Sequence, residues 1–140
     1  MVFIIKKYLP VAVVLLLCIL CLGGCKKINI NDDKIRDLDF TVVPQRDIPA
    51  ELKEIIEDSK ENVIRKTFTD KENLYIVVGY GEQPTSGYSI AVKELYEGKS
   101  VIYVKTWLIG PSKTDKVVEQ ITYPYIVIKI EYDDKRVVFK

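Results

Sequence analysis

The sequence contains no histidine, and its three cysteines all lie within the first 25 residues. The remainder therefore lacks the bases and thiols that Ser-His-Asp and Cys-His catalysis require, and it lacks the usual protein ligands of zinc. One glycine-rich stretch, GYGEQPTSG, has no Lys-Ser or Lys-Thr and runs into a strand pattern, so it is not a P-loop. These absences exclude several classes of enzyme.

Carboxylates are abundant, but their placement does not indicate catalysis. A hydrolase with paired carboxylates stays formally open, yet the acidic residues lie in the N-terminal segment, on the polar face of a helix and in short turns. The Asp pairs at 32–33 and 133–134 offer oxygen ligands for Ca²⁺ but have no spaced partners. We therefore expect a protein that is not an enzyme and has no cofactor or metal.

Basic residues do not gather into a patch. The chain has 21 basic and 20 acidic residues, and no basic run is interleaved with aromatic side chains. A nucleic-acid-binding domain normally carries a basic face. We expect no nucleic-acid partner.

The first 25 residues have the pattern of an export signal. Lys6 and Lys7 precede an almost wholly apolar run from Leu9 to Leu22. A run of about 14 residues suits a signal peptide and is shorter than the roughly 18 to 20 residues of a membrane-spanning helix. The following Leu-Gly-Gly-Cys resembles the bacterial lipobox, in which the cysteine receives a diacylglyceryl thioether. An uncleaved anchor is the alternative, and both place the remainder outside the cytoplasmic membrane.

The signal divides the chain into three parts. We expect a signal peptide at 1–24, a tether at 25–37 that is bound to membrane lipid through Cys25, and a single domain at 38–140 on the extracytoplasmic face of the bacterial cell membrane. Cys18 and Cys21 would leave with the signal peptide, so the domain would have no disulfide. Its stability would come from its core alone.

Alternating apolar residues predict a mainly β (α+β) domain. The stretch 38–43 alternates Leu38, Phe40 and Val42 with polar residues. A helix follows within 47–62, with Asp47 as a capping residue and one apolar stripe. Six further strands are expected at 63–69, 73–80, 87–96, 100–109, 124–132 and 135–139. The alternation slips near Lys93, which predicts a β-bulge. We expect an antiparallel β-sandwich or partly closed barrel of six to seven strands, with one amphipathic helix near its N-terminus.

The order of the strands separates two kinds of connection. In an up-and-down series, the short charged turns at 69–73, 97–99 and 133–135 fall at one end of the domain. The loops 81–87 and 110–123 then fall at the other end, beside the only tryptophan and four of the nine tyrosines. Exposed aromatic residues around loops favour a binding surface, although each can also pack in the core.

Two blocks of sequence in this region resemble a known family. LYIVVGYGEQPTSGYSIAVKEL and, after GPSKTD, ITYPYIVIKI are similar to the C-terminal domain of the protease complex subunit PrcB family. The resemblance spans about residues 63–132. It implies an exported lipoprotein, with a namesake that accompanies a surface protease as a non-catalytic subunit.

A weaker similarity is local to one loop. QPTSGY resembles the N-P-T-T-G-Y loop of chagasin-like cysteine-protease inhibitors, an immunoglobulin-like sandwich that presents three loops at one end. Gln83 and Ser86 depart from that motif, and Tyr123 stands where an arginine is usual. This similarity implies inhibition of a protease by the loop at 81–88 as an alternative function.

These observations predict a membrane-anchored domain that binds protein, as an accessory or regulatory partner of a secreted or surface protease. A structural envelope lipoprotein is the third alternative. The predicted lipidation site is Cys25. The predicted partner-binding residues are Tyr80, Pro84, Thr85, Ser86, Gly87, Tyr88, Trp107, Pro111, Tyr123, Pro124 and Tyr125.

Overall fold

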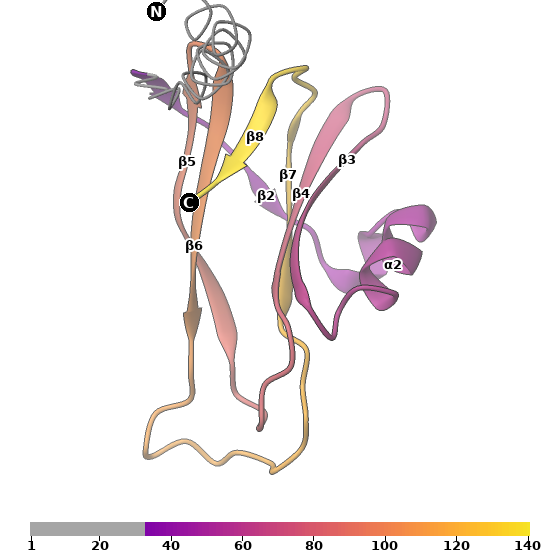
Figure 1. Cartoon of the computed structure of the whole chain (residues 1–140), viewed down its shortest axis with the longest axis vertical. Coiled ribbons are helices and arrows are strands. Elements are labelled where there is room, and N and C mark those ends of the chain that lie inside the picture. Colours follow the sequence, from indigo (N-terminus) through magenta and orange to yellow (C-terminus); the bar gives the residue numbers. More distant parts are fainter. Residues whose placement is uncertain (1–32) are drawn as a thin grey trace, which may run out of the picture. The chain divides into compact units, whose positions relative to one another are not determined.

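Eight strands and two short helices make up residues 33–140, the part of the chain that the computed structural model describes (Figure 1). In chain order they are β1 (Lys34–Asp37), β2 (Thr41–Val42), η1 (Gln45–Asp47), α2 (Ala50–Glu57), β3 (Val63–Thr69), β4 (Asn73–Tyr80), β5 (Ser89–Gly98), β6 (Val101–Ile109), β7 (Tyr125–Glu131) and β8 (Arg136–Phe139). These residues belong to one compact unit. None of the helices in this part of the chain is long and apolar enough to cross a membrane.

The strands form two four-stranded sheets packed face to face. Their orders are β1-β5-β6-β8 and β2-β7-β4-β3. All pairings are antiparallel except that of β8 with β6. The arrangement is a sandwich without a closed barrel, which confirms the first of the two predicted architectures.

The core explains why β4 reads as an unbroken apolar run. Alternate residues of β4 and β7, such as Ile76 and Ile128, pack between the sheets against Ile102 and Val104 of β6. The intervening residues face the other way and pack under Leu52 and Ile56 of α2 and Ile48 before it. The central strands of this sheet are thus buried on both faces, so neither face needs polar residues.

The six strands predicted after residue 62 are present, each within two residues of its expected ends. The pairing of β5 with β6 shifts register between Val92 and Glu94, which confirms the predicted bulge. These segments could be located because each packs apolar side chains against the core, which leaves an alternation or, in β4, an unbroken apolar run.

The N-terminal elements differ from the prediction. Within 38–43 only Thr41–Val42 form a strand, and Phe40 and Val42 are exposed while Val43 is buried. The Leu38 N–H donates to Leu95 of one sheet, and the Val43 N–H donates to Val127 of the other. The segment therefore crosses between the sheets and cannot keep one face inward.

Two boundaries near the N-terminus also change. Lys34–Asp37, expected as the end of the tether, form β1 and pair with β5. All four side chains are exposed, so this edge strand has no apolar alternation to reveal it. The helix begins at Ala50 after Pro49 without a side-chain cap, and Asp47 lies in η1 instead. Cys25, the signal peptide and residues 25–32 lie outside the described residues.

The two ends of the sandwich differ as the strand order predicts. The turns that follow β3, β5 and β7 meet at one end, here called the turn end, where the Tyr132 N–H donates to Glu72 at 2.8 Å. The loops 81–88 and 110–124 meet at the opposite end, here called the loop end (Figure 1). Successive strands do not always pair, because both of these loops cross from one sheet to the other.

Candidate functional site

The two loops of the loop end are joined by backbone hydrogen bonds. Gln83 and Thr122 exchange a pair of N–H···O bonds, of 2.8 and 3.0 Å. The Ser86 N–H donates to the Val118 carbonyl at 3.0 Å, and the Val118 N–H donates to the Ser86 Oγ at 2.8 Å. The loops therefore form one connected surface.

Glycine at position 87 is required for this close packing. Gly87 has a φ of 89°, a left-handed conformation that side chains disfavour. A Cβ at this position would lie 3.0 Å from the Pro111 Cβ and 3.3 Å from the Val117 Cγ1. A side chain at this position would therefore disturb the packing of the two loops. Pro111, a predicted contact residue, is half-buried and lies beside Gly87 of the other loop.

The hydroxyls of Thr85 and Ser86 are used inside the surface. The Thr85 hydroxyl donates to the Ser86 carbonyl at 3.1 Å, and the Thr122 hydroxyl donates to the Thr85 carbonyl at 2.7 Å. Together with the Ser86 Oγ, these groups hold the loop in shape. Pro84, which directly precedes Thr85, is exposed.

The predicted aromatic residues divide into exposed and packed groups. Trp107 is 56% exposed, and the Lys93 Nζ lies 4.7 Å from its ring centroid. Tyr80 turns inward, and its hydroxyl shares a 2.9 Å hydrogen bond with the Thr106 Oγ1 between the sheets. Tyr88 is half-buried, with its ring against Gly110. Trp107 is thus the most exposed of these three aromatic side chains.

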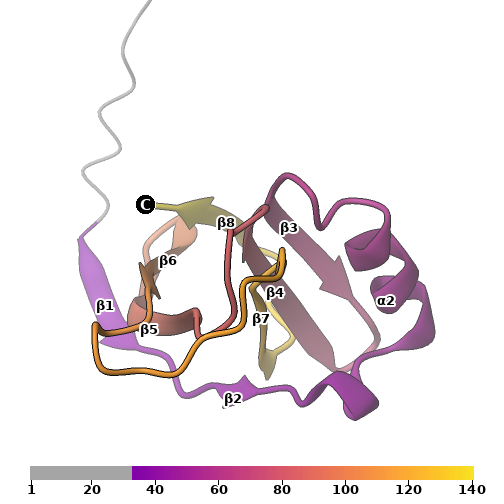
Figure 2. The same ribbon diagram turned by 90° about the horizontal axis from the view of Figure 1, so that it is seen from below.

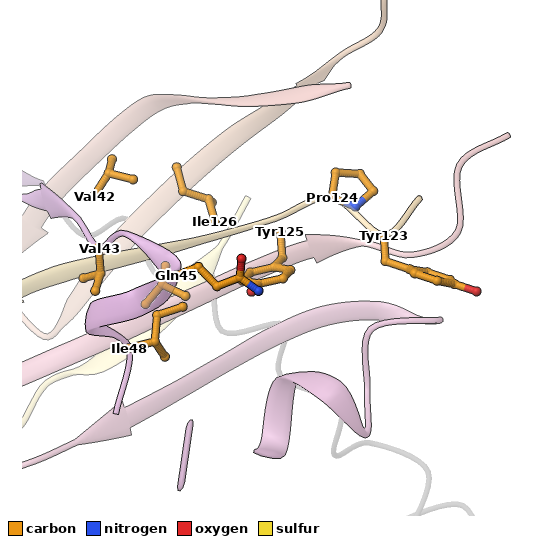
Figure 3. Close-up of a pocket in the computed structure, with 9 residues that line it drawn as sticks. Val42, Val43, Gln45, Ile48, Tyr123, Pro124, Tyr125 and Ile126 are labelled. Atoms are coloured by element: carbon orange, nitrogen blue, oxygen red, sulfur yellow. The ribbon is translucent and has the colours of Figure 1, made fainter. Parts of the chain in front are cut away.

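Tyr123, Pro124 and Tyr125 line a pocket of about 330 Å³ at the edge of β7 (Figure 3). Tyr125 lies beside Gln45 on the inner side of the pocket, while the ring of Tyr123 points away from them. Burial raises the pKa of the Tyr125 hydroxyl. The Lys60 Nζ lies 5.5 Å from the Tyr123 ring centroid. The two tyrosines thus differ in their surroundings: Tyr125 packs beside Gln45, whereas the Tyr123 ring points away from it.

Four exposed apolar residues of the loop end were missing from the sequence prediction. Together with Trp107 they form what we call the loop-end surface: Trp107, Ile109, Val117, Val118 and Ile121. The available signal was the apolar pair Val117-Val118 inside the otherwise charged and polar stretch 112–120. Without a strand to place it, that pair could equally have been read as buried.

The segment that builds this surface also matches a family model. Residues 74–131 match the model of the PrcB C-terminal family. This segment is therefore similar to the PrcB C-terminal domain. The match runs from the second residue of β4 to the last of β7 and includes both loops of the loop end. No curated protein and no solved structure matches the chain.

The PrcB C-terminal match accounts for part of the sandwich only. It leaves β1, β2, α2, β3 and β8 outside the matched range. The family is one of accessory subunits and is not known as catalytic. Similarity to the chagasin-like inhibitors is not found in these comparisons. Within residues 33–140, no group of three or more His, Cys, Asp or Glu side chains is placed to hold a metal ion.

Proposed function

We propose that this domain is a non-catalytic accessory or regulatory partner of an exported protease and binds it through the loop-end surface. The observation that carries the proposal is the concentration of exposed apolar side chains between residues 107 and 121, inside the segment that matches the family.

The chemistry of the surface fits protein recognition. An exposed apolar group with a tryptophan at its edge is typical of an interaction site, since tryptophan is enriched among residues that dominate binding energy. The hydrogen bonds between the loops fix their backbone before any partner binds. A preordered surface loses less conformational entropy on association.

The position of the loop end also suits a lipid-anchored protein. Lys34, the first residue of β1, pairs with Gly98 at the turn end. The nine residues of β6 span about 30 Å from there toward the loop end. With Cys25 lipidated, the chain would enter the domain at the turn end, and the loop-end surface would be free to meet a partner away from the membrane.

A protease inhibitor is the second candidate. Pro84 supports it, because this residue is exposed in the loop 81–88 and a loop stiffened by proline and by hydrogen bonds is suited to enter an active-site cleft. An inhibitor would lower the protease's activity in proportion to the amount added. An accessory subunit would bind without that loss.

The test is photo-crosslinking in intact envelopes. A photo-reactive amino acid replaces Val118 at the loop end, or Lys71 at the turn end as the matched control. We expect a crosslink from position 118 to an exported protease and none from position 71. The absence of a protease at 118, or equal crosslinking at both ends, would refute the proposal. The activity of the crosslinked protease then separates the accessory role from inhibition.

A further inference from the structure

The outer edge of β3 is a second surface, and no other strand within residues 33–140 pairs with it. The Tyr80 N–H donates to the carbonyl of Pro124, just before β7, so the alternation of β4 turns the backbone groups of Gly79, Val77 and Tyr75 toward β3. Their partners Ile64, Lys66 and Phe68 are therefore the hydrogen-bonded residues of β3. The residues between them point their N–H and C=O groups outward: Val63, Arg65, Thr67 and Thr69.

These four residues are also accessible to a partner. All four are exposed, whereas Ile64 is buried under α2. No strand among residues 33–140 pairs with this side of β3, which ends its sheet. An open strand edge with a regular ladder of N–H and C=O groups is complementary to another extended backbone.

A groove runs beside this edge. It has a volume of about 350 Å³ and lies between β3 and the turn and strand that follow β7. Arg65, Thr67 and Thr69 form one wall, and Arg136, Val137 and Phe139 belong to the other. Figure 2 shows β3 and β8 on the same side of the sandwich. A strand added to β3 would place alternate side chains in this groove.

The charges beside the edge favour an acidic occupant. Within the described residues Arg65 and Arg136 form no ion pair, and Lys66 bonds only to the Ser59 hydroxyl. Asp134 is the one carboxylate of the groove without an ion pair, because Asp133 is paired with Lys135. A second copy of this edge would bring two Arg-Lys pairs together, which is repulsive.

We propose that β3 binds an acidic, extended protein segment by strand addition, with acidic side chains near Arg65 and Arg136. This surface is separate from the loop-end surface and lies outside the residues that match the family model. Its failure would leave the proposed function untouched, since the crosslinking test does not involve β3.

The test uses the full chain in a mild detergent and a short capped peptide in which glutamate alternates with valine. Binding is followed by NMR amide hydrogen exchange. We expect slower exchange at Val63, Arg65, Thr67 and Thr69 when the peptide is added. The amides of Ile64, Lys66 and Phe68, which already pair with β4, exchange slowly with or without peptide and serve as internal controls.

Two matched changes separate strand addition from simple charge attraction. A peptide methylated on alternate amide nitrogens keeps its charge but loses the ladder, and it should not bind. Arg65→Glu should lower the affinity for the glutamate peptide by about tenfold or more and raise the affinity for a lysine peptide of the same design. Circular dichroism checks that the variant is folded. Equal binding of the methylated peptide, unchanged affinity in R65E, or protection elsewhere in the chain would overturn the proposal.

Discussion

Single atoms decide the shape of the loop end. The Ser86 Oγ accepts the Val118 N–H, and the hydrogen that Gly87 carries in place of a Cβ leaves room for Pro111 and Val117. Ser86 and Gly87 belong to the loop 81–88, and the sequence predicts that both contact a partner. In the structure they position the loop, and the exposed apolar residues supply the free surface.

Gly87→Ala should destabilise the domain. The substitution places a Cβ 3.0 Å from Pro111 in a left-handed backbone conformation, and we expect a loss of about 1–3 kcal/mol in the free energy of unfolding. Urea denaturation of the full chain in detergent measures it. Gly110→Ala is the control, because its φ is not positive and its new Cβ would lie 3.4 Å from Tyr88, an ordinary contact. Equal losses in both variants would contradict this account.

Ser86→Ala should also cost stability, by about 1 kcal/mol, because the Val118 N–H loses its acceptor. Ser89→Ala, at an exposed position of β5, should stay within about 0.5 kcal/mol of the parent. Denaturation midpoints compare the two. If S86A proves as neutral as S89A, the Ser86 hydroxyl is free for partner contact, as the sequence alone suggested.

At the scale of elements, a cluster of charges holds the turn end together. The Lys135 Nζ donates to one Glu97 carboxylate oxygen, and the Arg36 Nε donates to the other at 2.7 Å. The Glu97 side chain is only 12% exposed. Its carboxylate thus links β1, β5 and the turn between β7 and β8. These bonds, first to Lys135 and then to Arg36, hold the pKa of Glu97 below its usual value of 4.5.

The lowered pKa of Glu97 makes the turn end sensitive to acid. The stabilisation is fully present above the pKa of the unfolded chain, near 4.5, and is lost as the pH falls through the lower folded-state pKa. The parent chain should therefore lose stability below about pH 4.5, and Glu97→Gln should remove that part of the loss. Urea midpoints between pH 6 and pH 3 test it. Asp70, whose pKa is also lowered by backbone hydrogen bonds, should still titrate in E97Q. If the urea midpoints of parent and variant fall in parallel as the pH is lowered, Glu97 is not a source of the acid sensitivity.

The elements show where sequence periodicity is sufficient. Strands β3 to β8 pack apolar side chains against the core, and the pattern of these residues located the strands and even the bulge beside Lys93. β1 is held by backbone pairing and by the Arg36–Glu97 ion pair, and its side chains are exposed, so no apolar pattern marks it. Val42 and Phe40 alternate correctly and are nevertheless exposed, because that segment crosses between sheets. Periodicity reports burial, and it fails where pairing occurs without burial.

At the scale of the whole molecule, strand direction located the candidate site before any side chain was placed. Each strand reverses the chain, so the two loops had to share an end, although the sheet order was not predictable. Which residues are exposed there depends on packing between the loops. Trp107 was found from its type, whereas Val117 and Val118 were not, because an apolar pair in a loop carries no sign of its exposure.

Trp107 is the only tryptophan in the chain, so it reports on the orientation of the loop end. If Cys25 is lipidated as proposed, the full chain should keep its tryptophan emission in vesicles that contain short-range brominated lipid quenchers, because β1 begins at the turn end and β6 carries Trp107 away from that end. Aqueous acrylamide should quench the same emission, because the Trp107 ring is exposed to solvent. Cys25→Ser, which removes the proposed anchor, is the control for vesicle attachment. Strong quenching by brominated lipid would instead place the loop-end surface on the bilayer, where it would be covered by lipid rather than presented to a protease.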